Sequence, residues 1–205
     1  MSYFELTTLK TVIFGAGKAG AGIEAWVGDA DARGRLLGAW NSDIGGLNEV
    51  TLLRGFDSLD DMMAERERMH RSENPFNCVA HLVGMKAESY RSLDFLGPVE
   101  IGDFGPFYEI RTYHMRLNGL MPTMQKWQDA IPTRLGYSPM VTAMYALDGA
   151  PRLTQIWPYR SLEDRGKARG QSVADGNWPP KGGPDWLTPD MTSTIAMPLP
   201  FSPLK

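Results

Sequence analysis

The chain has 205 residues, of which 42% are hydrophobic and 22% charged, a composition typical of a globular protein that buries a core. Its formal net charge of −3 argues against a nucleic-acid or anionic-membrane partner, because such partners are bound by basic surfaces. The single cysteine excludes a disulfide framework, and we expect a reducing, cytoplasmic location. No run of about 18 apolar residues and no signal-peptide pattern is present, so we expect no membrane insertion.

Two distant segments share one pattern. Tyr3–Leu9 and Phe107–Tyr113 both read aromatic, aromatic, Glu, aliphatic, any residue, Thr, with Glu5 and Glu109 in the same place. Both segments alternate as strands do and are rich in aromatic and β-branched residues. A repeat of this length indicates a duplicated domain, and we place the two copies at residues 1–102 and 103–205.

The first copy reads as six elements. Ile23, Trp26 and Ala30 recur at helical spacing, and Ser58 with Asp61 has the form that starts a helix. A turn at 43–46 joins two strands as a hairpin. The patterns predict strands over residues 3–13, 36–40, 49–56 and 90–96 and helices over 18–32 and 58–70.

The second copy repeats this order. Ser161 with Asp164 corresponds to the Ser58 helix start. Residues 175–189 are rich in Pro and Gly and contain Trp178 and Trp186, so we expect an ordered surface loop that is packed by tryptophan. The predicted strands cover residues 107–113, 140–147, 152–159 and 191–197, and the helices cover 119–134 and a segment from 161.

The order β-α-β-β-α-β is that of a ferredoxin-like unit, whose helices cover one face of an antiparallel sheet. The other face of the sheet must then be either solvated or buried against another sheet, and duplication supplies a second sheet. We therefore predict an α+β fold of two ferredoxin-like repeats whose antiparallel sheets pack as an α+β barrel, closed either within one chain or between the chains of a homodimer.

Gly15, Gly17 and Gly20 match the spacing of a dinucleotide-binding loop after a strand. The repeat argues against that interpretation, because Gly119, the counterpart of Gly15, has no glycine triplet around it. A nucleotide-dependent oxidoreductase therefore stays an alternative to be tested, and we expect no cofactor.

Several short motifs together resemble the NIPSNAP family. They are Tyr108–Tyr113, Gly38–Trp40 with Gly46–Asn48, Phe56–Leu59 or Tyr159–Leu162, and the tail Pro198–Leu204. The resemblance implies tandem NIPSNAP-type domains in the dimeric α+β barrel superfold. It implies no settled reaction. It supports a protein-interaction role as much as a ligand site, since the family is associated with membrane-trafficking and mitochondrial partners in eukaryotes. The second copy keeps Glu109 and Arg111, whereas the first keeps Asn48 but has Thr7 in place of the arginine, so a single asymmetric site is expected.

The candidate site surrounds the strand at 107–113. If the two sheets meet, we expect Glu109, Arg111 and Tyr113 to point into the barrel, where a buried Glu and Arg must pair with each other or face a polar ligand. In one interpretation Glu109 and Arg111 form an ion pair with a structural role only. In the other they form a binding site, in which Arg111 would hold a carboxylate, enolate or carbonyl oxygen of a ligand and Glu109 would orient Arg111 or act as a base.

Other residues are secondary candidates. Trp40 could line an apolar cavity or belong to the core, and Asn48 is a further candidate for ligand binding. His114 should lie on the face opposite Arg111, which weakens it as a partner. The three histidines and the cysteine lack metal-ligand spacing, so no metal site is expected. The sequence thus favours a small organic ligand in the barrel lumen, bound or converted without a cofactor; the alternative is a non-enzymatic protein–protein interaction module.

Overall fold

The computed structural model describes residues 1–205 and contains eight strands in one closed antiparallel barrel with four covering helices. The strands are β1 (Tyr3–Thr11), β2 (Arg35–Ile44), β3 (Glu49–Phe56), β4 (Leu82–Ser92), β5 (Phe107–Met115), β6 (Thr142–Ala146), β7 (Arg152–Tyr159) and β8 (Leu187–Pro198). The helices are α1 (Ala16–Val27), α2 (Leu59–Arg71), α3 (Leu120–Arg134) and α4 (Leu162–Ala174), with three short 3-10 turns at Pro75–Asn77, Val79–His81 and Gly183–Trp186.

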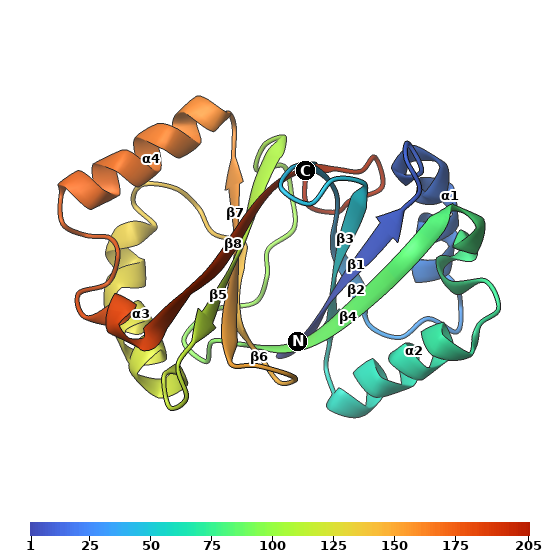
Figure 1. Cartoon of the computed structure of the whole chain (residues 1–205), viewed down its shortest axis with the longest axis horizontal. Helices are drawn as coiled ribbons and strands as arrows, with labels where there is room; N and C mark the ends of the chain where they lie inside the picture. The colour runs from blue at the N-terminus through green and yellow to red at the C-terminus, as the bar shows by residue number, and fades with distance from the viewer.

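The barrel consists of two sheets of equivalent order. The first half supplies β4-β1-β3-β2 and the second supplies β8-β5-β7-β6, and the β2–β8 and β4–β6 pairs join the two sheets. Helices α1 and α2 lie outside the first sheet and α3 and α4 outside the second, on opposite flanks of the molecule (Figure 1). The predicted pair of ferredoxin-like repeats is confirmed, and the barrel closes within one chain.

Local signals explain the start of the second helix in each half. Ser58 and Ser161 cap α2 and α4, each accepting a hydrogen bond from the backbone N–H three residues ahead. This interaction satisfies one of the donors that a helix start leaves free. Both helix starts were predicted from the sequence.

Two predicted boundaries are wrong. β4 begins at Leu82 rather than at residue 90, because its exposed first part pairs with β1 although it lacks an apolar alternation. β8 begins at Leu187, inside the predicted loop. Trp178 packs this loop against the protein, as expected: it is buried and lies edge-on against Trp127 and Trp157, with ring centroids 5.0 and 6.2 Å away.

Three apolar cores follow from this arrangement. One fills part of the barrel lumen, where the Trp40 and Tyr108 rings lie 5.2 Å apart, and one lies between each sheet and its helices. The C-terminal tail crosses to the first half, where Leu199 donates a backbone hydrogen bond to Ala39. The fully buried Leu204 then joins the lumen core.

Candidate functional site

Glu109, Arg111 and Tyr113 lie on the helix-covered face of β5, not in the lumen as predicted. Glu109 contacts arginines of α4, and Tyr113 belongs to the core beneath α3 and α4. The alternation of the strand is as expected, but the face is reversed. The physical reason is that the sheet-to-sheet interface is largely apolar and takes Tyr108 and Ile110, while arginine partners for Glu109 are available only from the helix side.

Glu109 is fully buried and surrounded by donors. Its Oε1 accepts hydrogen bonds from Arg111 Nη1, from Arg165 Nη2 at 2.6 Å and from Ser193 Oγ at 2.7 Å. Burial alone would raise the pKa of Glu109, but hydrogen bonds from Arg165 and Ser193, together with the neighbouring Arg111 charge, hold that pKa at about 2. Glu109 is therefore an anion at neutral pH, and its low pKa makes it a weak proton acceptor.

Two further arginines lie close to this carboxylate. Arg169 Nη1 is 3.8 Å from Glu109 Oε2, an ion pair without a hydrogen bond. Arg134 is buried, stacks over Trp157 at 4.3 Å and donates to Ser138 Oγ at 2.9 Å, with no carboxylate partner. Burial lowers the pKa of Arg134, and the positive charge of Arg169 lowers it further. One carboxylate therefore faces four guanidinium groups.

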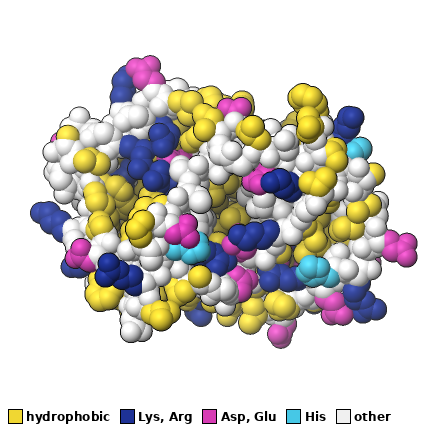
Figure 2. Space-filling view, viewed as in Figure 1, with side chains coloured by type: hydrophobic (Ala, Val, Ile, Leu, Met, Phe, Trp, Pro, Cys, Tyr) yellow, Lys and Arg dark blue, Asp and Glu magenta, His cyan; other side chains and the backbone are white.

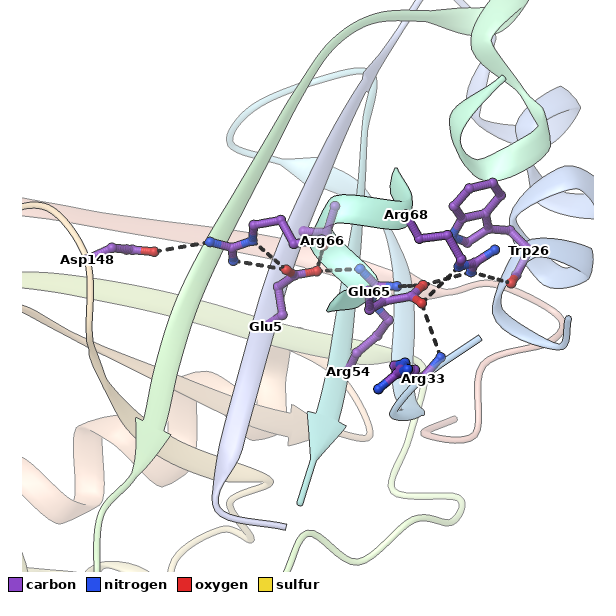
Figure 3. Close-up of polar contacts among 9 residues, drawn as sticks. Glu5, Trp26, Arg33, Arg54, Glu65, Arg66, Arg68 and Asp148 are labelled. Atoms are coloured by element: carbon purple, nitrogen blue, oxygen red, sulfur yellow. Dashed lines mark hydrogen bonds and ion pairs between the residues drawn. The ribbon is translucent and has the colours of Figure 1, made fainter. Parts of the chain in front are cut away.

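The equivalent place in the first half is electrically balanced (Figure 3). Glu5 pairs with Arg54 and with Arg66, and Arg54 Nη1 also lies 2.7 Å from Glu65 Oε1. Arg66 reaches the Asp148 carboxylate at 3.7 Å. Each arginine here has a carboxylate, as expected for buried charges that serve stability.

Of the other predicted site residues, Tyr113 contacts the Glu109 cluster, because its Oη accepts a hydrogen bond from Arg111 Nε at 2.6 Å. Trp40 and Asn48 lie elsewhere. Trp40 lies buried in the lumen core. Asn48 lies in the β2–β3 turn in the left-handed region, with φ 58°, and its backbone oxygen accepts from Thr11. The structure thus brings three of the five candidates together and leaves two elsewhere.

The lumen itself opens into a cavity of about 840 Å³ at one end of the barrel. Leu6 and Ile110 form its apolar floor, and His114 lies in its wall, on the face opposite Arg111 as expected. The rest of the wall is mainly polar and includes Thr8, Thr51, Thr112, Thr192, Thr194, Glu49, Lys86, Glu88, Asp148 and Arg152.

The charged groups of this wall are paired, four of them with one another and Glu49 with Lys10 at 4.0 Å, outside the cavity lining. Arg152 Nη2 lies 2.9 Å from Glu88 and 2.8 Å from Asp148, and Lys86 lies 2.9 Å from Glu88. Arg152 Nε also donates to the hydroxyl of Tyr90 at 3.1 Å. The groups left to meet a ligand are the threonine hydroxyls and the His114 imidazole.

The loop at Gly15 does not have the setting of a dinucleotide site. β1 before it lies between β3 and β4 in an antiparallel sheet, whereas that motif belongs to a parallel βαβ unit. Gly15 is needed for a local reason, since a Cβ there would approach Val12 O to 2.8 Å. No group of three or more His, Cys, Asp or Glu side chains is placed to hold a metal ion.

The family model named NIPSNAP matches the chain twice, over residues 4–92 and 108–203. The chain belongs to the NIPSNAP family. The resemblance predicted from the sequence motifs is thereby confirmed, and the two matches fall on the two halves of the barrel. No curated protein matches this NIPSNAP chain, and no helix in it is long and apolar enough to cross a bilayer.

Solved structures share the architecture of this NIPSNAP protein. A Lactobacillus acidophilus protein provisionally named a monooxygenase is similar over 97% of this chain and 94% of its own, at 10% identity and a TM-score of 0.68. An anthrone oxidase-like protein is similar over 97% of this chain and 91% of its own, at 12% identity and a TM-score of 0.68. A NIPSNAP family protein of unknown function from Agrobacterium tumefaciens is similar over 50% of this chain and 96% of its own, at 25% identity and a TM-score of 0.45. At 10% and 12% identity the first two show the fold alone.

The sequence reading missed the arginines of α4. Arg165 and Arg169 stand four residues apart and therefore share one helix face. That spacing, in a helix whose start had been predicted, was the available signal. Arg134 gave no such signal, because its burial depends on the Trp157 and Trp178 packing that only the fold creates.

Proposed function

We propose that this NIPSNAP protein binds a small, partly apolar and uncharged organic molecule in the lumen cavity of its barrel. The observation that carries the proposal is the cavity of about 840 Å³, which lies within the range typical of ligand pockets. Its apolar floor and hydroxyl-rich wall suit a molecule with one hydrophobic side and hydroxyl or carbonyl groups. Because each wall charge already has a partner, with Glu49 paired to Lys10 and the others to one another, a net ionic ligand gains little there.

Conversion of that molecule without a cofactor is an extension of the same proposal. His114 is the imidazole of the wall, with Nε2 3.8 Å from Asp190 Oδ2, and an imidazole is a group that can exchange a proton with a bound hydroxyl or carbonyl compound. Similar folds described as a monooxygenase and an anthrone oxidase-like protein make aromatic carbonyl compounds a sensible first choice of probe.

The test combines native mass spectrometry with NMR. The purified protein is searched for a co-purified small molecule, and a panel of uncharged aromatic ketones and phenols is titrated against amide shifts. We expect Thr112→Val and His114→Gln to weaken binding while the fold is retained, and His70→Gln, the same change on the exposed side of α2, to leave it unchanged. Shift changes outside the lumen walls, or equal affinity in all three variants, would contradict the proposal.

An interaction module is the second candidate, because an exposed apolar turn follows the first strand of each half. Ile13 and Phe14 are 73% and 87% exposed, and Leu117 and Met121 are 80% and 70% exposed. Apolar groups exposed in this way favour a partner or a homodimer. Sedimentation of the wild type and of Phe14→Asp tests the homodimer: self-association that the aspartate abolishes supports it, and a monomer at all concentrations excludes it.

A further inference from the structure

The arginine cluster around Glu109 consists of Arg111, Arg134, Arg165 and Arg169, and its positive charge exceeds its negative charge. Arg111, Arg165 and Arg169 have no carboxylate partner other than Glu109, and Arg134 has none. Figure 2 shows a group of Lys and Arg side chains gathered between α4 and β8. Partly buried cations of this kind need a counter-charge, because burial disfavours an unpaired ion.

The cluster also contains unused hydrogen-bond donors. Arg169 donates no side-chain hydrogen bond, and Arg165 Nε is buried without a partner. Arg165, Arg169 and Arg111 are only 29, 29 and 15% exposed, so their guanidinium groups are held in place yet reach the surface. Ser193, exposed on β8, adds a hydroxyl beside Arg111 Nη1 at 3.3 Å.

The geometry points to a second ligand site, separate from the lumen, at which this cluster binds a small oxyanion, a carboxylate or a phosphate group. Guanidinium forks on two helix residues one turn apart and on the adjacent strand present planar pairs of donors, which match the oxygens of such anions. Glu109 stays ionised and orients Arg111 and Arg165, so it is a positioning residue and not a ligand-contacting one.

The first half shows that the fold does not require an excess of positive charge at this place. At the same distance from the capping serine, α2 has Glu65 where α4 has Ala168, and Arg66 where α4 has Arg169. Glu65 supplies the carboxylate that neutralises the first cluster, with Arg54 and Arg68 both 2.7 Å away. The second half keeps the helix arginine, Arg169, but has Ala168 in place of the glutamate. An external anion can therefore supply the missing negative charge.

The experiment measures thermal unfolding and calorimetric binding with inorganic phosphate and, separately, acetate, at constant ionic strength so that general screening does not change. We expect a saturable rise in Tm with at least one anion. Arg165→Gln and Arg169→Gln should each weaken Kd by about tenfold, the effect of losing one charge-assisted hydrogen bond. Arg66→Gln, at the matched position of the first half, should leave Kd unchanged.

Ala168→Glu provides a second, independent arm. It places in the second half the carboxylate that the first half has, and it should abolish anion binding without removing any arginine. Uncharged lumen probes should still bind this variant. A wild type without a saturable response to either anion, or equal responses in Arg66→Gln and Arg169→Gln, would overturn the inference.

Discussion

The two halves of this barrel share one topology and one buried glutamate at the same strand position, yet they treat its charge differently. Glu5 sits in a balanced network in which Arg54, Arg66 and Arg68 meet Glu5, Glu65 and Asp148. Glu109 sits alone among four arginines. The difference comes from four aligned positions, where Thr7, Arg54, Met62 and Glu65 are replaced by Arg111, Trp157, Arg165 and Ala168.

This contrast separates a network that serves stability from one that retains charge for another purpose. In the first half Arg54 serves two buried carboxylates at once, and its loss leaves Glu5 with Arg66 alone and Glu65 with Arg68 alone. In the second half the arginines substitute for one another around Glu109, so removal of one leaves the carboxylate paired. The two halves should therefore respond differently to equivalent mutations.

The largest effect is expected at Arg54, which is 2% exposed and bridges Glu5 and Glu65. Arg54→Leu should lower the free energy of unfolding by about 4 kcal/mol, because two buried carboxylates each lose one of their two arginine partners and keep only Arg66 and Arg68. Urea denaturation at pH 7 measures the loss. Adding Glu65→Ala should restore part of it, and a double variant no more stable than the single one would show that charge is not the cause.

Glu109→Gln comes next, with a loss of about 3 kcal/mol at pH 7, since the amide keeps the shape but removes the only anion of the cluster. The folded-state pKa of Glu109 is depressed to about 2, so its stabilising effect is complete above the unfolded pKa of about 4.3 and is lost as the pH falls toward 2. Denaturant curves at several pH values should show wild type and variant converging below pH 4.3. A constant difference would refute the assigned pKa.

The matched pair Arg66→Gln and Arg169→Gln should separate the halves directly. Arg66 makes hydrogen-bonded contact with Glu5 at 2.9 Å, so its loss should cost about 1–3 kcal/mol. Arg169 is one of several cations around one carboxylate, and its loss should change stability by less than about 0.5 kcal/mol. Thermal and urea unfolding in a buffer free of oxyanions make the comparison, which fails if the two losses are equal.

The smallest effect concerns the two hairpin turns. Asn48 has φ 58° in the first half, and Gly149 has φ 64° in the second. Asn48→Ala should cost about 1 kcal/mol, because alanine lacks the short polar side chain that lets asparagine tolerate the left-handed region, whereas Asn48→Gly should be nearly neutral. If Asn48→Gly instead abolished binding of a lumen probe, Asn48 would be a ligand contact and not merely a turn residue.

Much of the fold could be predicted because it depends on local patterns that occur twice. The match between Tyr3–Leu9 and Phe107–Tyr113, with the paired serine caps, indicated two equal units and hence two sheets. β4 was harder to place, since its exposed first part pairs with β1 through backbone groups that carry no side-chain pattern.

The site was half predicted. Alternation separated Arg111 from His114 correctly, but it cannot say which of two buried faces meets the helices and which meets the other sheet. That choice depends on the partners offered from far along the chain, here Arg165 and Arg169 on α4. A rule that buried charge should follow the nearest helical arginines would have selected the correct face.

Closure of the barrel within one polypeptide removes a symmetry that two identical chains would impose, since a dimer of like halves must present each lumen residue twice. Here Lys10 and Glu49 in one half stand where His114 and Arg152 stand in the other. The two walls of the lumen are therefore chemically unlike. The ligand that we propose for this cavity would therefore meet two different walls and be held in one orientation, with one ligand per chain.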